Sequence, residues 1–264
     1  MDTVLQARLP FAPWTDPRVW RLPGTQPADP DDWVRIDEAY AGQMRLRDGL
    51  IAGRRDDVLA LCPEARAPAR ELLEVCIARA RTLADFQVTS GVIRRPDGQR
   101  LPADREDPLV TVGRIFQEDF CILQKPPGGK EHVLTGAVLC FPAGWSLAEK
   151  IGRPLMRIHA PVPGYGDVGP RVQRMFDGLK PGRPVWRANA HLYDEPSLFF
   201  PRREADPRAP KVEGRFIRSE HQVLFRLPDT KAVVFSIHTY VVARSSLPDG
   251  AEAALALRQL TSGQ

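Results

Sequence analysis

The chain has 264 residues, a formal net charge of +4 and a hydrophobic fraction of 43%, which is the composition of a globular protein able to bury its own core. No stretch approaches the ~18 apolar residues of a membrane span, and the start of the chain lacks the order of a secretory signal, so we expect a cytoplasmic protein. The four cysteines form no Cys-x-x-Cys pair, which excludes the ligand patterns of zinc ribbons, iron–sulfur clusters and covalently attached haem.

The basic charge allows two interpretations. The isoelectric point is near 9.0, but arginines are interleaved with acidic residues, and basic stripes with aromatic residues are missing, which argues against a nucleic-acid-binding protein. A solvated surface of mixed charge is the simpler interpretation. The alternative is a site for an anionic cofactor that carries propionates or phosphates.

Residues 1–85 are predicted to form a mainly helical N-terminal part. After a proline-rich start, Asp31-Asp32-Trp33 has the early acidic residues of a helix start, and apolar residues recur to about Ile51. A second helix is predicted from about Pro68 to Leu83, where apolar residues recur at three- and four-residue spacing.

Residues 86–245 are predicted to form a sheet-rich core. Short apolar runs indicate strands at 86–93, 120–125, 132–141, 185–193, 216–227 and 231–243. The segment Pro126 to Lys130 is a turn between two of these strands. Short helices are predicted at 146–151 and 168–179, and a C-terminal helix lies within 246–264. This order favours a single α+β domain, an antiparallel sheet flanked by helices with an N-terminal helical segment.

His159 lies in the stiffest segment of the chain. Pro161 and Pro163 remove backbone donors and favour extended neighbours, so this segment ends an element or forms a rigid loop. The apolar surround and the nearby Arg153 and Arg157 suit a haem, which needs one fixed imidazole, apolar walls and arginines near its propionates. The alternative is a structural histidine in a packed core.

Strand alternation predicts which polar residues share a face. Arg187, Asn189 and His191 alternate with apolar residues. In the last hairpin, matching the apolar faces predicts that odd residues oppose odd ones, with His238 beside Glu220 or Gln222. The polar set of that hairpin comprises Arg218, Glu220, Gln222, Ser236, His238 and Tyr240. A solvent-facing sheet would show the same polarity. His221 then falls on the apolar face as a hydrogen-bonded core histidine.

A set of ordered motifs carries a resemblance to a known family. The motifs are Gln117–Leu123, Leu139–Trp145, Lys150–Leu155, Ile158–Tyr165, Arg187–Asn189, Glu220–Pro228 and Val234–Tyr240. The sequence resembles the haem-dependent oxidative N-demethylase family, in particular its haem-binding α-subunit-like members, which include dimethylamine monooxygenase subunits.

The resemblance implies a PAS-like haem fold and the O₂-dependent oxidation of a small methylated amine to a smaller amine and formaldehyde. It implies non-covalent haem b on this chain, and a partner reductase that carries FMN and a 2Fe-2S cluster and takes electrons from NADPH. His159 is the expected axial ligand of the iron. Arg153, Arg157 and Tyr165 are the other candidate cofactor-binding residues, and the candidate catalytic residues, chosen from position and face, are Arg187, Asn189, Glu220 and His238.

The sequence departs from the family pattern at three positions. Ala190 replaces a tryptophan, and His221 and His238 replace arginines. These departures leave two further hypotheses open. One is a non-catalytic PAS-like module that keeps the haem or another small ligand as a sensor. The other is a non-haem metal site of His191, His238 and Glu220, a pair of histidines with one carboxylate.

Overall fold

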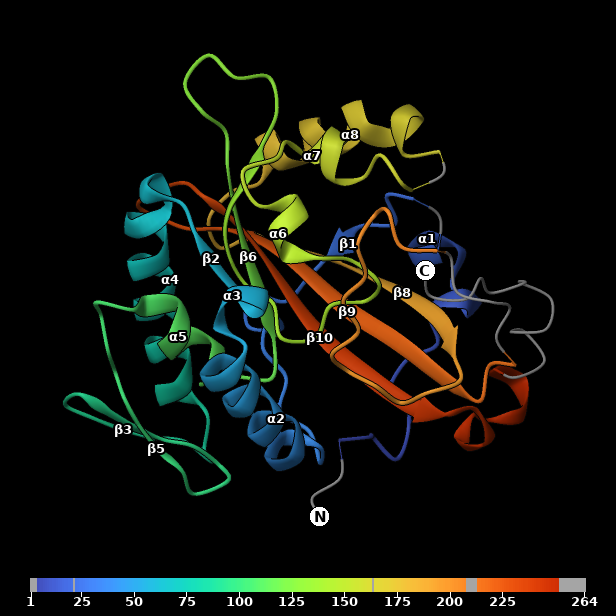
Figure 1. The fold of residues 1–264 in the computed structure, drawn as a ribbon, viewed down its shortest axis with the longest axis horizontal. Helices are drawn as coiled ribbons and strands as arrows, with labels where there is room; N and C mark the ends of the chain where they lie inside the picture. Colours follow the sequence, from blue (N-terminus) through green and yellow to red (C-terminus); the bar gives the residue numbers. More distant parts are fainter. Residues whose placement is uncertain (1–3, 21, 163, 208–212, 252–264) are drawn as a thin grey trace.

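A seven-stranded antiparallel sheet with helices on both faces dominates the structure (Figure 1). The computed structural model describes residues 4–20, 22–162, 164–207 and 213–251. The strand order is β1-β8-β9-β10-β6-β7-β2, and a separate small sheet has the order β3-β4-β5. The α+β prediction is therefore confirmed.

The helices and strands have the following bounds. The helices are α1 (Pro17–Trp20), α2 (Tyr40–Gly53), α3 (Arg55–Val58), α4 (Arg66–Thr82), α5 (Pro108–Gly113), α6 (Leu147–Lys150), α7 (Leu155–Ile158) and α8 (Tyr165–Gly178). The strands are β1 (Gln26–Pro27), β2 (Leu59–Leu61), β3 (Gln87–Thr89), β4 (Val92–Arg94), β5 (Arg100–Pro102), β6 (Asp119–Gln124), β7 (Val133–Val138), β8 (Val185–Tyr193), β9 (Phe216–Arg226) and β10 (Val233–Ala243).

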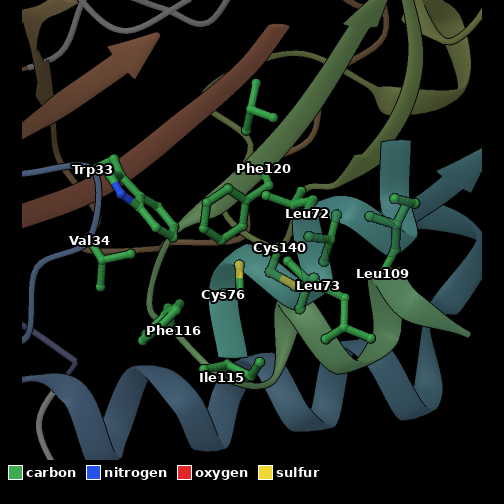
Figure 2. Close-up of a cluster of buried hydrophobic side chains, with 14 of the residues drawn as sticks. Trp33, Val34, Leu72, Leu73, Cys76, Leu109, Ile115, Phe116, Phe120 and Cys140 are labelled. Atoms are coloured by element: carbon green, nitrogen blue, oxygen red, sulfur yellow. The ribbon is translucent and has the colours of Figure 1, made fainter. Parts of the chain in front are cut away.

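Both faces of the large sheet are buried beneath other elements. Residues that pair directly on neighbouring strands project to the same face, so the register shows which residues share each face. On the face that we call the α2–α4 face, Phe120 and Val223 share one apolar cluster with Trp33 and with Leu72 of α4. Figure 2 shows the Trp33 and Phe120 rings side by side in this cluster. The other face, which we call the α7–α8 face, buries residues of β6 and β9 against Leu155 of α7 and Phe176 of α8. The helices α4 on one face and α7 and α8 on the other therefore pack on different apolar clusters.

Several elements lie where the sequence predicts them. Strand β8 has the predicted bounds, and α4 closely matches the helix predicted from about Pro68 to Leu83. Strands β6 and β7 pair across the predicted turn. The segment of His159 follows α7, at the end of an element.

The prediction that a helix starts at Asp31-Asp32-Trp33 is wrong, because α2 begins only at Tyr40. The Asp29 carboxylate accepts a hydrogen bond from the backbone N–H of Asp31 at 2.9 Å. The Asp37 carboxylate accepts one from Ala39 at 3.0 Å. Such local side-chain bonds favour turns over helix, which explains the late start.

The strand predicted over 86–93 is two strands, β3 and β4, which form a hairpin. Gly91 in the turn has φ +81°, a conformation that residues with a Cβ rarely adopt. The apolar residues therefore predicted β-structure in this region correctly, but Gly91 divides the region into two strands.

The predicted register of the β9–β10 hairpin is also wrong. Val233 pairs with Arg226, so odd residues oppose even ones, and His238 pairs with His221 instead of Glu220 or Gln222. Nearly every side chain in both strands is buried. Because both faces are covered, burying one apolar face does not select the register.

Most of the predicted C-terminal helix falls on residues 252–264, outside the described residues. Within the described part of the chain, no helix has the length and apolarity needed to cross a membrane.

Candidate functional site

His159 directly follows α7, and two contacts hold its imidazole. Its Nδ1 lies 2.9 Å from the carbonyl oxygen of Leu155, and its ring stacks on Tyr165 with centroids 4.2 Å apart and an interplanar angle of 10°. Because a carbonyl oxygen only accepts, Nδ1 carries the proton in this bond. Nε2 keeps its lone pair and makes no hydrogen bond to any described residue.

Burial lowers the pKa of His159, and the nearby charges of Arg187 and Lys150 also lower it, against the opposing effect of the Leu155 carbonyl. The imidazole is therefore neutral near pH 7, which is the form that binds a metal. Histidine ligands usually donate their second ring N–H to a carbonyl or carboxylate, as His159 does to Leu155.

Lys150 fixes the position of this segment. Its Nζ donates to the carbonyl oxygen of Ile158 at 2.8 Å and to Glu204 at 2.6 Å. Glu204 also accepts both Nη donors of Arg157, at 3.0 and 2.9 Å. Arg157 is therefore ion-paired with Glu204 through both Nη groups. The other candidate arginine, Arg153, is exposed. Sequence patterns gave no signal for Glu204, which lies far along the chain.

A row of polar side chains crosses the α7–α8 face at the middle of the sheet. Arg187 donates to the side-chain oxygen of Gln222 at 2.9 Å, and the Gln222 amide donates to Glu220 at 2.7 Å. Asn189 donates to the same Glu220 oxygen at 2.9 Å. The structure thus brings together Arg187, Asn189 and Glu220. Gln222 is the link between them.

Arg187 connects this row to His159. Its charge lowers the pKa of both His159 and Tyr165, so Arg187 lies within electrostatic range of this stacked pair. Burial lowers the pKa of Arg187, and the Glu220 charge opposes this. Its Nε is buried and has no hydrogen-bond partner among the described residues. A buried donor without an acceptor in the described part of the chain is suited to bind an acceptor on a ligand.

His238 does not belong to this row. It lies on the α2–α4 face, where Nδ1 is 2.8 Å from Glu118 and Nε2 is 3.1 Å from Asp37. Burial lowers its pKa, but the two carboxylates outweigh burial and raise the pKa to about 9. The expected contact of His238 with Glu220 is therefore wrong, because the sheet separates them.

The hypothetical metal site of His191, His238 and Glu220 fails for the same reason. His191 pairs with Arg218 on the α7–α8 face, whereas His238 lies on the opposite face. Across the described ranges, no group of three or more His, Cys, Asp or Glu side chains could hold a metal ion.

The three departures from the family pattern all lie on the face away from His159. Ala190 shares a small apolar cluster with Trp14. His221 is buried and stacks on Trp186, with ring centroids 5.3 Å apart, as expected of a core histidine. His238 pairs with His221 across β9 and β10.

The residues on the α7–α8 face fit a haem. His159 offers an Nε2 lone pair with the tautomer already fixed, and Arg187 offers a buried donor to an anionic group. Leu155, Ile158 and Leu224 belong to the apolar cluster on this face, which can pack against a porphyrin. His159 would hold the iron.

Comparison with known families agrees with this chemistry. The model of the family described as haem-dependent oxidative N-demethylase, alpha subunit-like, matches residues 24–263. This range includes His159, the polar row on β8 and β9, and the helices that cover them. The chain therefore belongs to the haem-dependent oxidative N-demethylase family, as an alpha-subunit-like member.

Proposed function

We propose that this chain is the haem-binding subunit of an enzyme that oxidatively removes a methyl group from a small, dimethylamine-like amine. The observation that carries the proposal is the His159 imidazole, whose Nδ1–H bond to Leu155 and stacking on Tyr165 leave Nε2 ready for a metal. The proposal includes a PAS-like fold for the sheet and its helices, and a cytoplasmic location.

Haem b held by His159 would supply the iron that activates O₂ for oxidation of the N-methyl carbon. In the balanced reaction, one oxygen atom leaves in formaldehyde and the other in water, and the amine nitrogen keeps a hydrogen in place of the methyl group. NADPH supplies the electrons through FMN and a 2Fe-2S cluster on a partner reductase. An alpha-subunit-like chain without its own cluster motif suits this division of labour.

The chain's own residues bind and orient the substrate. Glu220 is buried, and its carboxylate attracts the ammonium form of an amine. Asn189 and Gln222 hold Glu220 Oε2 by hydrogen bonds of 2.9 and 2.7 Å. Oε1 lies 3.7 Å from Nη2 of Arg218 and makes no hydrogen bond to a described residue, so it is the oxygen that would accept from the substrate. The apolar cluster beneath α7 and α8 excludes water from the reacting carbon.

An absorption spectrum after haem reconstitution tests the proposal. We expect a Soret band in the wild-type protein and in His221→Ala, and its loss or a strong shift in His159→Ala. His221 is the control because it is a buried histidine on the opposite face of the sheet. An unchanged Soret band in His159→Ala, with all three proteins folded by circular dichroism, would sink the ligand assignment.

Turnover separates an enzyme from a haem sensor. With a flavin and iron–sulfur reductase, NADPH, O₂ and dimethylamine, we expect formaldehyde in proportion to the NADPH consumed. Haem binding without any formaldehyde from dimethylamine, trimethylamine or N-methylated amino acids would favour the sensor.

A further inference from the structure

Three residues on the α7–α8 side carry buried donors that have no acceptor within the described part of the chain. Among the described residues, nothing accepts from the hydroxyl of Tyr193, from Nε of Arg218, or from Nε and Nη1 of Arg202. Tyr193 ends β8, Arg218 lies near the start of β9, and Arg202 is on the connection between these strands. Tyr193 is 6% exposed and Arg218 is 1% exposed.

These three side chains lie together, and we call them the Tyr193 corner. The guanidinium carbon of Arg218 is 6.0 Å from the centroid of the Tyr193 ring. Burial raises the pKa of Tyr193 and the Glu220 charge adds to this rise, whereas the charges of Arg218 and Arg202 oppose it, so both guanidinium groups lie within electrostatic range of the phenol. Phe200 packs edge-on against the same ring at 5.7 Å.

Arg218 is held in one orientation. Its Nη1 donates to the carbonyl oxygen of Leu198 at 3.0 Å, and its Nη2 donates to that of Phe141. Glu220 Oε1 is 3.7 Å from Nη2, which is beyond hydrogen-bonding distance. The Nε–H of Arg218 therefore has no acceptor in the described ranges, while its two Nη groups are fixed by hydrogen bonds.

In the polar row and the Tyr193 corner together, the cationic side chains outnumber the carboxylates bonded to them among the described residues. Arg187, Arg202 and Arg218 are cationic, and Glu220 is the one carboxylate bonded into the polar row. Arg202 has no ion pair with any described carboxylate. Buried charges are normally paired, so the arrangement calls for an anion. An arginine presents its donors in a planar fork that matches a carboxylate.

We propose that the Tyr193 corner binds the carboxylate group of a ligand, whose oxygens accept hydrogen bonds from Arg202, Arg218 Nε and the Tyr193 hydroxyl. A carboxylate can come from a haem propionate, which rests on the function proposed above. It can also come from a free small molecule, such as an N-methylated amino acid, which does not need haem.

The test compares Arg202→Gln and Tyr193→Phe with the control Arg203→Gln, an exposed arginine next to Arg202 on the same connection. Each apoprotein is titrated with haem and with haem dimethyl ester, whose propionates are blocked, and affinity is read from the Soret band. Each apoprotein is also titrated with sarcosine, followed by the shift in Tm and by calorimetry.

If a propionate occupies the corner, Arg202→Gln and Tyr193→Phe weaken haem binding about tenfold each, and the ester binds all four proteins alike. If a free carboxylate occupies it, haem affinity stays the same, and the two variants lose the sarcosine response that wild type and Arg203→Gln retain. The proposal is overturned if neither variant differs from Arg203→Gln in any titration. Failure of wild type to bind haem would count against the proposed function alone, because the sarcosine arm does not depend on haem.

Discussion

His221 and His238 lie directly opposite each other on β9 and β10, on the α2–α4 face. Both are buried, yet they take opposite charge states near pH 7. Burial lowers the pKa of His221, and the charges of Arg35 and His238 add to this, even though Asp32 opposes it. Glu118 and Asp37 raise the pKa of His238 to about 9. One histidine is therefore neutral and its neighbour is protonated, which avoids repulsion between like charges.

His238→Gln should destabilise the protein in a pH-dependent way. The folded-state pKa is raised from 6.5 to about 9, so the stabilisation is fully present below pH 6.5 and is lost as the pH rises through about 9. At pH 7 we expect the free energy of unfolding to fall by about 3 kcal/mol. Urea denaturation of both proteins at pH 7 and pH 10 measures this. A difference between wild type and variant that stays constant over this range would contradict the charge assignment.

The ion pair of Arg47 with Asp119 should be among the most costly to break. Its Nη1–Oδ1 distance is 2.6 Å, and both side chains are almost fully buried. Asp119 also accepts from the backbone N–H groups of Cys140 and Phe141, so it organises the chain after β7. Arg47→Ala leaves this carboxylate buried without its cation, which should cost about 3–5 kcal/mol of unfolding free energy.

A surface ion pair supplies the control for this prediction. Arg54 pairs with Asp57 at 2.8 Å, but both side chains are more than half exposed. Arg54→Ala should therefore cost less than about 1 kcal/mol. Equal losses in Arg47→Ala and Arg54→Ala would show that the burial of the first pair is energetically unimportant.

Patterns of neighbouring residues predicted the elements that depend on alternation, helix periodicity or proline positions within one segment. The alternation in β8 gave its bounds and placed Arg187 and Asn189 on one face, because side chains of a strand alternate regardless of its partners. The prolines after His159 correctly predicted that it lies at the end of an element. The helix periodicity of α4 worked because this helix buries one stripe.

Features that depend on distant parts of the chain were not predictable in this way. The register of β9 and β10 depends on the helices that cover both faces, and an error of one residue moved His238 to the wrong face. The hydrogen bond between Lys150 and Glu204 joins the last residue of α6 to the connection between β8 and β9, 54 residues further along the chain. The Arg202 donors that lack an acceptor among the described residues become apparent only once the sheet and its covering segment are assembled.

Glu220→Gln should retain haem but lose activity. The amide keeps the size of the side chain but removes the negative charge that attracts the ammonium substrate. We expect kcat/KM for dimethylamine to fall about 100-fold, with the Soret band unchanged. Glu74→Gln is the control, since Glu74 lies on α4 and pairs with exposed Arg105, away from the polar row. Equal activity of the two variants would exclude Glu220 as the substrate-binding carboxylate.

Gly169 should control the position of His159 through the contact between α7 and α8. A Cβ at Gly169 would overlap the sulfur of Met156 on α7 and would touch Tyr165, which stacks on His159. Gly169→Ala therefore requires Met156 to move, and its flexible side chain keeps the stability cost near about 1 kcal/mol. We expect the Soret maximum to shift and haem to dissociate several times faster.

Gly178→Ala on the same helix provides the matched control. A Cβ at Gly178 meets nothing within 4 Å, so the substitution only reduces the freedom of the unfolded chain and should stabilise by up to about 1 kcal/mol. Its Soret band and haem dissociation rate should equal those of wild type. If both alanine variants bind haem as wild type does, the packing of α7 on α8 does not position the ligand, and the bonds from Leu155 and Lys150 suffice to hold His159.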